Sequence, residues 1–531
     1  MKNRITRRLL AGTLCIAMAV PLVPTVPAIA SPTEEGLSLA REIAGEGIIL
    51  LKNENQGLPL KETEKISIFG SSQIEAFYGG GGSGSTSAEN AVTFLGALQA
   101  EGIQYNQELV DIYQEWWNNG GSEMDYRPSG DAVNYDDFAA GTVARAEMPL
   151  TDEMISSAKE YSDTAVIIIG RAGSEGSDLQ AGDVRLYPAE EEMVEKVATS
   201  FDKVVVLFNT CNIMEMGFLE EYDSIQSAAI IWAPGEQGMT SVAQMLTGKI
   251  TPSGKLTDTV AYSVEDHPST VNFGDFPLPE DQRNETIQAN IDAGLDGRYA
   301  GQTFVNYAED IYVGYRYFET FEQPVQYEFG YGLSYTDFDV ELLSFEADEE
   351  TVTVEAEVTN VGDTYAGKEV VQIYYGAPEG ELEKPAKELA AYGKTDLLEP
   401  GESQTLKISF DTSDMASYSE EEAAWVLEKG DYNIYCGTSV KMVEEAGVYT
   451  LEEDVVNKFD SATGNEIQNL FSDCRGDFTL LSQDDPEGTY PTVPETGEPT
   501  GSYKGESEEV EKPDFSVLKE GEELAPILLQ D

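Results

Sequence analysis

One apolar run, Thr164-Ala165-Val166-Ile167-Ile168-Ile169, constrains the fold of this chain more than any other stretch. Its length and its β-branched side chains are typical of a buried strand. The run leads directly into a glycine-rich, charged loop at 170–178. Because α/β proteins keep their sites at the sheet edge where strands end, the polar side chains of this loop are candidate site residues. Glu175 is the first candidate, although a loop carboxylate in a chain with 98 Asp and Glu residues is more often a solvated surface group.

Strands and helices alternate on both sides of this run, from residue 37 to about residue 256. Helices are predicted after the N-cap residue Thr151 and from Pro188, each with apolar residues at helical spacing. The other predicted strands lie at 48–53, 65–70, 203–209 and 228–233. This alternation predicts an α/β sandwich, in which a mostly parallel sheet has helices on both faces.

The pattern changes to β after Asp337. Residues 351–358 alternate between apolar and polar with period two, and further short strands are separated by turns. A second domain, an all-β antiparallel sandwich, is therefore predicted. The predicted division of the chain is a signal peptide at 1–30, an α/β sandwich domain at 31–260, a loop-rich connecting segment at 261–336, a β-sandwich at 337–448 and an acidic linker or tail at 449–531.

The first 30 residues have the features of a secretory signal peptide. Lys2, Arg4, Arg7 and Arg8 precede an apolar stretch at 9–26, and small residues at 28–30 offer a cleavage site. A membrane anchor is the alternative, but the prolines at 21, 24 and 27 make a poor spanning helix. We therefore expect the protein to be secreted and to act outside the cell or at its surface.

The formal net charge of −66 argues against nucleic acid or an anionic membrane as a partner, because both would be repelled. After signal cleavage, Cys211, Cys436 and Cys474 are too widely spaced for a disulfide framework or a metal site. The single histidine, His267, excludes a multi-histidine metal site. None of these residues implies a cofactor.

A second glycine-rich loop, at 79–86, follows the strand predicted at 65–70. A phosphate-binding P-loop would need a lysine before its Ser or Thr, and this loop has none. Its glycines instead allow a ligand to approach the backbone closely, with Ser83 and Ser85 offering hydroxyl groups.

Several stretches together resemble the second and third domains of glycoside hydrolase family 3, the β-glucosidase and β-xylosidase family, and they occur in the family's order. They lie at 46–53 with 58–60, in the glycine-rich loop through Ser83, and at 171–178, 251–256, 311–317, 329–335, 366–370 and 398–403. The resemblance covers roughly residues 37–448. It implies an α/β sandwich followed by a fibronectin type III-like domain.

The resemblance also implies roles for single residues. In many family members the Glu of the Arg-x-x-Gly-Glu-Gly-x-Asp loop is the general acid/base, and Glu175 occupies that place, with Ser174 where glycine is commoner. The serine of the glycine-rich loop commonly hydrogen-bonds the sugar, and Ser83 matches it. Arg171 and Asp178, at the two ends of the same motif, are expected to bind the substrate as well.

The implied function is that of a secreted glycosidase of the β-glucosidase type, which cleaves a β-glycoside or an oligosaccharide with retention. Such cleavage needs two carboxylates about 5 Å apart, one as acid/base and one as nucleophile. Glu175 would protonate the leaving oxygen and then activate water, which favours a raised pKa. Two carboxylates and water suffice, so no cofactor is expected.

In this family the nucleophilic Asp, and a Lys-His pair that grips the sugar, come from a TIM-type barrel of roughly 250 residues. No stretch here has the repeated βα pattern of that barrel, and Lys does not precede the single histidine. We therefore expect no nucleophile in this chain, which resembles the front portion of a member with inverted domain order. Its expected partner is a separate or downstream barrel domain.

A second hypothesis is a non-catalytic carbohydrate-binding or accessory cell-surface protein built from the same two domains. Trp116, Trp117 and Tyr126 could then stack on sugars, although such aromatic side chains are more often part of a core or an interface. Affinity for glucosides in the absence of a barrel would favour this hypothesis.

Overall fold

The computed structural model describes residues 33–84, 90–121, 143–173, 179–274, 276–280, 284, 288, 303–469 and 478–494. The predicted signal peptide, Glu175 and Asp178 lie outside these residues, as does the side chain of Ser83. By its internal contacts the chain divides into two units, Met1–Ala40 and Arg41–Asp531. The described part of the first unit contains the beginning of helix α1 (Glu34–Glu46), and the other elements belong to the second.

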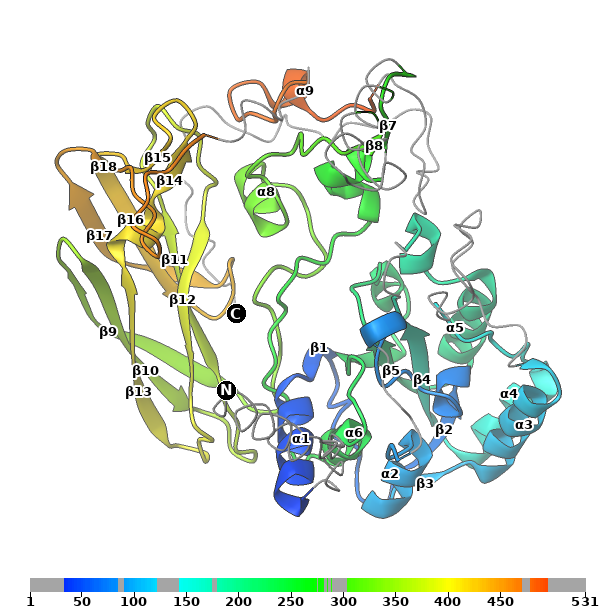
Figure 1. Cartoon of the computed structure of the whole chain (residues 1–531). Coiled ribbons are helices and arrows are strands. Elements are labelled where there is room, and N and C mark those ends of the chain that lie inside the picture. The colour runs from blue at the N-terminus through cyan, green and yellow to red at the C-terminus, as the bar shows by residue number, and fades with distance from the viewer. Residues whose placement is uncertain are drawn as a thin grey trace, which may run out of the picture. The chain divides into compact units, whose positions relative to one another are not determined.

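A six-stranded sheet in the order β1-β6-β5-β4-β2-β3 forms the centre of the first domain (Figure 1). Its strands are β1 (Ile49–Asn53), β2 (Lys65–Phe69), β3 (Gln104–Tyr105), β4 (Thr164–Arg171), β5 (Lys203–Thr210) and β6 (Ile225–Ile230). All neighbouring pairs from β6 to β3 are parallel, whereas β1 pairs antiparallel with β6. The predicted mostly parallel sheet is confirmed, with one antiparallel strand at its edge.

Strand β4 is buried along its whole length and divides its side chains between two cores. Ala165, Ile167 and Ile169 belong to one core, and Val166 and Ile168 to the other. Burying each such valine or isoleucine stabilises the fold by about 1.5–3 kcal/mol. The run therefore favours a strand in the middle of the sheet, where both of its faces are covered. Helices on opposite faces complete the two cores (Figure 1): α3 (Gln107–Asn118), α4 (Asp152–Tyr161) and α5 (Pro188–Ser200) on one, and α2 (Phe94–Glu101) and α6 (Gly238–Leu246) on the other.

The second domain is a sandwich of two antiparallel sheets, ordered β13-β10-β9 and β12-β11-β16-β17. Strand β10 buries every second residue, Val352, Val354, Ala356 and Val358, as its period-two pattern predicts. A smaller sheet has the order β14-β15-β18. The bounds are β9 (Phe338–Ala347), β10 (Thr351–Asn360), β11 (Val370–Gly376), β12 (Glu388–Lys394), β13 (Ser403–Asp411), β14 (Ser417–Ser419), β15 (Ala424–Leu427), β16 (Gly430–Gly437), β17 (Val443–Leu451) and β18 (Val455–Asn457).

Short elements form the segment that connects the two domains and the chain after the sandwich. They are β7 (Phe276–Pro277), β8 (Thr303–Phe304), α8 (Tyr315–Thr320) and α9 (Pro486–Thr489). The 3-10 helices of the described chain are η1 (Ser71–Gln73), η2 (Gly82–Gly84), η4 (Ala181–Val184), η5 (Gly217–Glu220), η6 (Val264–Asp266), η7 (Pro268–Asn272) and η8 (Thr412–Met415).

Part of the predicted acidic tail is packed against the connecting segment. Leu481 and Tyr490 are buried in a small core with Tyr312, Tyr317 and Phe318. The peptide nitrogen of Leu481 also donates to the carbonyl of Ala308 at 2.8 Å. The strands likewise continue past the predicted boundary at 448, because β17 ends at Leu451 and β18 follows it. Two large apolar side chains within a polar sequence thus anchor this segment in the small core.

Ion pairs join the α/β domain to the fibronectin-like domain. Glu46 is paired with both Lys368 and Lys394, and the Nζ of Lys255 lies 2.8 Å from Glu369 Oε1. Burial raises the pKa of Glu46, but the two lysines outweigh this effect and hold the pKa below its ordinary value.

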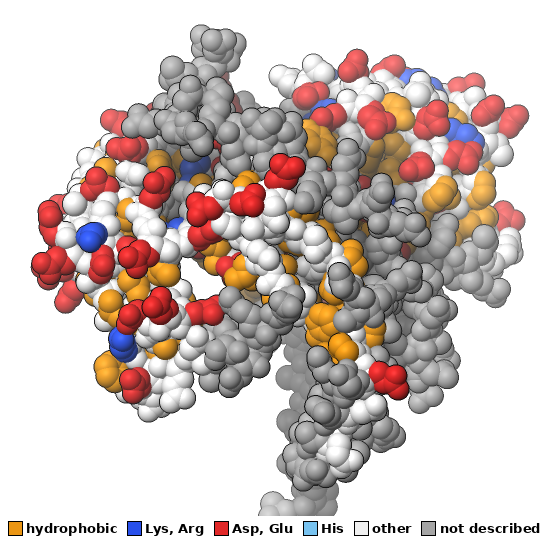
Figure 2. All heavy atoms as spheres, turned by 90° about the horizontal axis from the view of Figure 1, so that it is seen from above, with side chains coloured by type: hydrophobic (Ala, Val, Ile, Leu, Met, Phe, Trp, Pro, Cys, Tyr) orange, Lys and Arg blue, Asp and Glu red, His pale blue; other side chains and the backbone are white. Residues whose placement is uncertain are grey.

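The surface reflects the acidic composition. On the face shown in Figure 2, Asp and Glu side chains are spread over the coloured surface with few Lys and Arg side chains between them. Within the described ranges, no helix combines the length and the apolar character that a membrane crossing requires.

Candidate active site at the carboxyl edge of the sheet

The parallel strands end at one edge of the sheet, and the loops that follow them contact one another. Gly81, in the glycine-rich loop after β2, donates its peptide N–H to the carbonyl of Gly173, after β4, at 2.8 Å. Cys211, which follows β5, donates its peptide N–H to the carbonyl of Arg171 at 3.1 Å. The structure therefore brings the described parts of the two predicted site loops into direct contact, although about 90 residues separate them in sequence.

Two glycines allow the chain just after β2 to lie close to β4. Gly70 has a φ of +100°, and a Cβ there would lie 2.2 Å from the carbonyl oxygen of Ile168. A Cβ on Gly170 would lie 2.2 Å from the hydroxyl of Ser72. A side chain at Gly70 would clash with the backbone of β4, and one at Gly170 would clash with the chain just after β2.

Arg171 is completely buried, with a relative exposure of 0%. Its guanidinium donates to the carbonyls of Gly170 at 2.8 Å, Asp183 at 2.8 Å and Arg185 at 2.6 Å. It thus ties the end of β4 to the chain on the far side of the loop that contains Glu175.

The charge of Arg171 is balanced by Glu190 of α5, which is only 4% exposed. The two side chains form a bidentate pair with distances of 2.7 and 2.5 Å, and the guanidinium lies 4.4 Å from the centroid of the Tyr187 ring. Bidentate pairs of this kind hold a fixed geometry. The donors of Arg171 are therefore engaged within the protein, and its predicted contact with the substrate stays a prediction.

A second buried acid, Glu147, lies behind the same edge. Its Oε2 accepts the peptide N–H of Ser71 at 2.9 Å, and its Oε1 accepts that of Met148 at 3.0 Å. The hydroxyl of Tyr113 donates to Oε1 at 3.1 Å and accepts the peptide N–H of Gly70 at 3.2 Å. This network fixes the turn that follows β2.

The pKa of Glu147 is raised to about 7, because burial and the nearby charge of Glu190 together outweigh the opposing effect of the hydrogen bonds. Glu147 is not among the site residues predicted from the sequence, and it ends a polar, weakly periodic stretch at 118–147. A single acid in a weakly periodic polar stretch carries no signal of burial.

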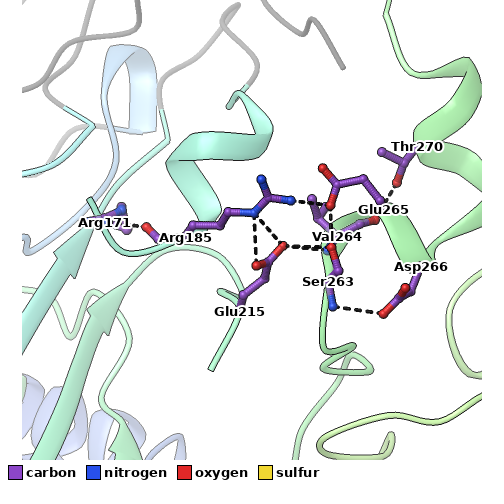
Figure 3. Close-up of polar contacts among 8 residues, drawn as sticks. All are labelled: Arg171, Arg185, Glu215, Ser263, Val264, Glu265, Asp266 and Thr270. Carbon is purple, nitrogen blue, oxygen red and sulfur yellow. Dashed lines mark hydrogen bonds and ion pairs between the residues drawn. The ribbon is translucent and has the colours of Figure 1, made fainter. Parts of the chain in front are cut away.

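Arg185 links the sheet edge to the connecting segment (Figure 3). Its Nε lies 3.0 and 3.1 Å from the carboxylate oxygens of Glu215, and its Nη2 pairs with Glu265. Glu215 also accepts the peptide N–H of Val264 at 2.8 Å, and Thr270 donates to the carbonyl of Val264 at 2.7 Å. The pairs hold η6 beside the chain that follows the Arg171 loop.

The lone histidine and the tryptophans of α3 have structural positions. His267 packs edge-on against Phe318 at 4.9 Å, and burial lowers its pKa. Trp117 is 9% exposed, and Trp116 packs against the core beneath α3. Tyr126 lies outside the described residues. In the part of the chain that the structure describes, no three His, Cys, Asp or Glu side chains are grouped so that they could hold a metal ion.

Two family models match the chain. The model of the glycosyl hydrolase family 3 C-terminal domain matches residues 48–335, more than half of the sequence. The chain belongs to glycosyl hydrolase family 3. A fibronectin type III-like model matches residues 369–440 of this family 3 chain. The predicted family and the predicted pair of domains are confirmed by these matches.

Named relatives are similar over most of this family 3 chain. Beta-glucosidase A of Butyrivibrio fibrisolvens is 33% identical over 519 residues, which cover 87% of this chain and 57% of that protein. A beta-glucosidase of Ruminococcus albus is 36% identical over 433 residues, covering 80% of this chain and 41% of that protein.

Solved structures show the same relationship. A beta-glucosidase from Paenibacillus barengoltzii has a TM-score of 0.70 and 37% identity, covering 81% of this chain and 45% of that one. Beta-glucosidase 3B from Thermotoga neapolitana, in complex with alpha-D-glucose, has a TM-score of 0.67 and 34% identity. The match covers 80% of this chain and 55% of that one. This family 3 chain thus spans about half the length of the relatives that it matches.

Proposed function

We propose that this chain supplies the acid/base side of a β-glucosidase active site and that its substrates are β-glycosides or oligosaccharides. The observation that carries the proposal is the backbone contact between Gly81 and Gly173. It joins the loop whose serine matches the sugar-binding position to the loop whose glutamate matches the acid/base position. The relatives named as beta-glucosidases support the same substrate class.

In the proposed reaction, Glu175 gives its proton to the glycosidic oxygen while a nucleophilic carboxylate attacks the anomeric carbon. The alcohol leaves, and the sugar remains bound to the carboxylate as an ester. The ionised Glu175 then takes a proton from water, whose oxygen displaces the carboxylate and restores both groups. The sugar is released with its configuration retained, and no cofactor is consumed.

The nucleophile in this proposal comes from a TIM-type barrel on a separate or downstream segment. The two buried acids near the Arg171 loop are unsuited to attack. Glu190 is held by Arg171, and Glu147 accepts three hydrogen bonds and has a pKa of about 7, so much of it is protonated at neutral pH. A group that is enclosed and already hydrogen-bonded cannot reach an anomeric carbon.

We place the activity outside the cell. The basic and apolar pattern of residues 1–30 supports export, and the highly acidic composition suits a soluble protein with an uncharged carbohydrate as its substrate.

The proposal predicts that the chain alone hydrolyses aryl β-glycosides negligibly and that activity appears when a family 3 barrel is supplied. Glu175→Ala should then lower turnover by about 10²–10⁴, the usual contribution of general acid–base catalysis. Glu160→Ala, which removes an exposed acid at the end of α4, is the matched control and should leave turnover unchanged. Strong turnover by the isolated chain would contradict the proposed division of the site.

The accessory-protein hypothesis has less support. Trp117 is buried and Trp116 packs on a core, so the described tryptophans of α3 offer no open stacking platform. Binding of glucosides by the isolated chain at millimolar concentration would favour that hypothesis over the enzymatic one.

A further inference from the structure

Asn209 lies next to last in β5, directly beside Gly170 of β4. Its relative exposure is 0%, and its amide makes three hydrogen bonds. The Oδ1 accepts the peptide N–H of Phe77 at 2.8 Å, while the Nδ2 donates to the carbonyl of Phe77 at 2.8 Å and to that of Trp232 at 2.7 Å. One side chain therefore holds the backbone after β2 and the backbone after β6.

Both held segments lie at the carboxyl edge of the sheet, one after β2 and the other after β6. Phe77 precedes the glycine-rich loop that contains Ser83 by a few residues, and its own ring is covered by Arg145 at 4.2 Å. Trp232 has a φ of +51°, which a bulky residue adopts only when its surroundings enforce it. A further bond, from the peptide N–H of Gly235 to the carbonyl of Tyr78 at 3.1 Å, connects the same two loops.

The chemistry of these contacts requires an asparagine amide. The site presents one peptide N–H and two carbonyls, so the side chain must accept one hydrogen bond and donate two. A carboxylate would accept from Phe77 but would face two carbonyl oxygens, and an alanine would leave all three groups unpaired in a buried place.

We infer that Asn209 is a positioning residue, which fixes the glycine-rich loop against the turn at 232–236 and thereby sets the place of Ser83 relative to the sugar. The inference rests on the proposed function for its catalytic consequence. The clamp itself is a property of the described residues and can be tested without activity.

Asn53 provides a matched control at another place in the sheet. Its amide donates to the carbonyl of Leu58 at 3.0 Å and accepts the peptide N–H of the same residue at 2.8 Å, and Ser227 donates to it at 2.8 Å. It is thus a clamp of the same type on β1 that touches none of the site loops. If the loss of such a clamp acts only by lowering overall stability, alanine variants of Asn53 and Asn209 should behave alike.

The experiment compares Asn209→Ala, Asn209→Asp and Asn53→Ala in the full chain by hydrogen exchange and thermal unfolding. Both Asn209 variants are expected to lose protection in peptides covering 74–84 and 231–237 but not in β4, whereas Asn53→Ala loses protection near 53–58 alone. With a barrel supplied, the Asn209 variants should raise KM for an aryl β-glucoside by about tenfold, as expected when one buried hydrogen-bonding group is lost, and Asn53→Ala should leave KM unchanged.

Unchanged protection at 74–84 in Asn209→Ala would overturn the inference. So would an equal rise in KM for Asn53→Ala, because the effect would then follow general stability. If no variant or wild type is active with a barrel, the proposed function fails, while the exchange data still decide whether Asn209 holds the loops.

Discussion

Arg171 illustrates how a residue expected to bind substrate can be enclosed by its own protein. Its motif places it at the end of β4, but its guanidinium is surrounded by three carbonyls and by Glu190. The sequence contains no sign of this arrangement, because Glu190 lies in the first turn of a predicted helix, where acids are common. Burial and pairing of polar residues depend on the tertiary fold, so Glu147, Glu190 and Asn209 could not be identified from the sequence.

Removing the Arg171 side-chain charge should destabilise the fold strongly. Arg171→Met leaves the Glu190 carboxylate buried without its partner, which typically costs about 3–5 kcal/mol. Lys458→Met is the control, since its ion pair with Glu422 is exposed on both sides and should contribute little to stability. Unfolding by urea, followed by circular dichroism, measures both values. Equal losses for the two variants would contradict the assigned role of the buried pair.

Glu147 should give the protein a measurable pH dependence. Its folded pKa of about 7 lies above the ordinary value of 4.5, so its favourable contribution is complete below about pH 4.5 and is lost as the pH rises through 7. The stability of wild type relative to Glu147→Gln should therefore fall by up to about 3 kcal/mol between pH 4.5 and 8. Urea unfolding of both proteins across this range measures the difference. A difference that is constant with pH would show that Glu147 does not titrate in the fold as described.

At the level of elements, long apolar runs were predicted well and short or exceptional elements were not. The runs at 164–169 and 203–209 form β4 and β5, because burial on both faces leaves a continuous apolar signature. Strand β3 has two residues, too few for any pattern. The strand predicted at 228–233 is shifted, since β6 spans Ile225–Ile230 and Trp232 adopts a left-handed conformation that apolar character does not reveal.

The segment at 478–494 was predicted to be an acidic tail, because its polar composition does not reveal that two of its side chains are buried. Leu481 is 1% exposed, so Leu481→Ala should cost about 2–5 kcal/mol by leaving a cavity in the small core around Tyr312 and Tyr317. Val493→Ala, at a residue that is 50% exposed, is the control and should have little effect. Thermal unfolding and limited proteolysis of the full chain measure the two outcomes. A Leu481→Ala variant as stable as wild type would mean that this segment does not dock.

At the scale of the whole molecule, two family 3 domains are held together by the ion pairs of Glu46 and Lys255, and the loops of the candidate site meet at the edge of one sheet. Two buried acids, Glu147 and Glu190, lie near this edge of the sheet, and we assign the nucleophile to a barrel. The family and the order of the domains could be predicted from motifs. The buried contacts that hold the site loops in place could not be predicted, because they join residues that are far apart in the sequence.

The role of Glu175 is tested most directly by how the rate depends on the leaving group when a barrel is supplied. Glu175→Ala should lower kcat/KM for an alkyl or phenyl β-glucoside by about 10²–10⁴, because these leaving groups need a proton. A dinitrophenyl β-glucoside, whose phenolate leaves without a proton, should lose far less in its glycosylation step. An equal loss for both substrates, or no loss for either, would contradict the assignment of Glu175 as the acid of a glycosidase.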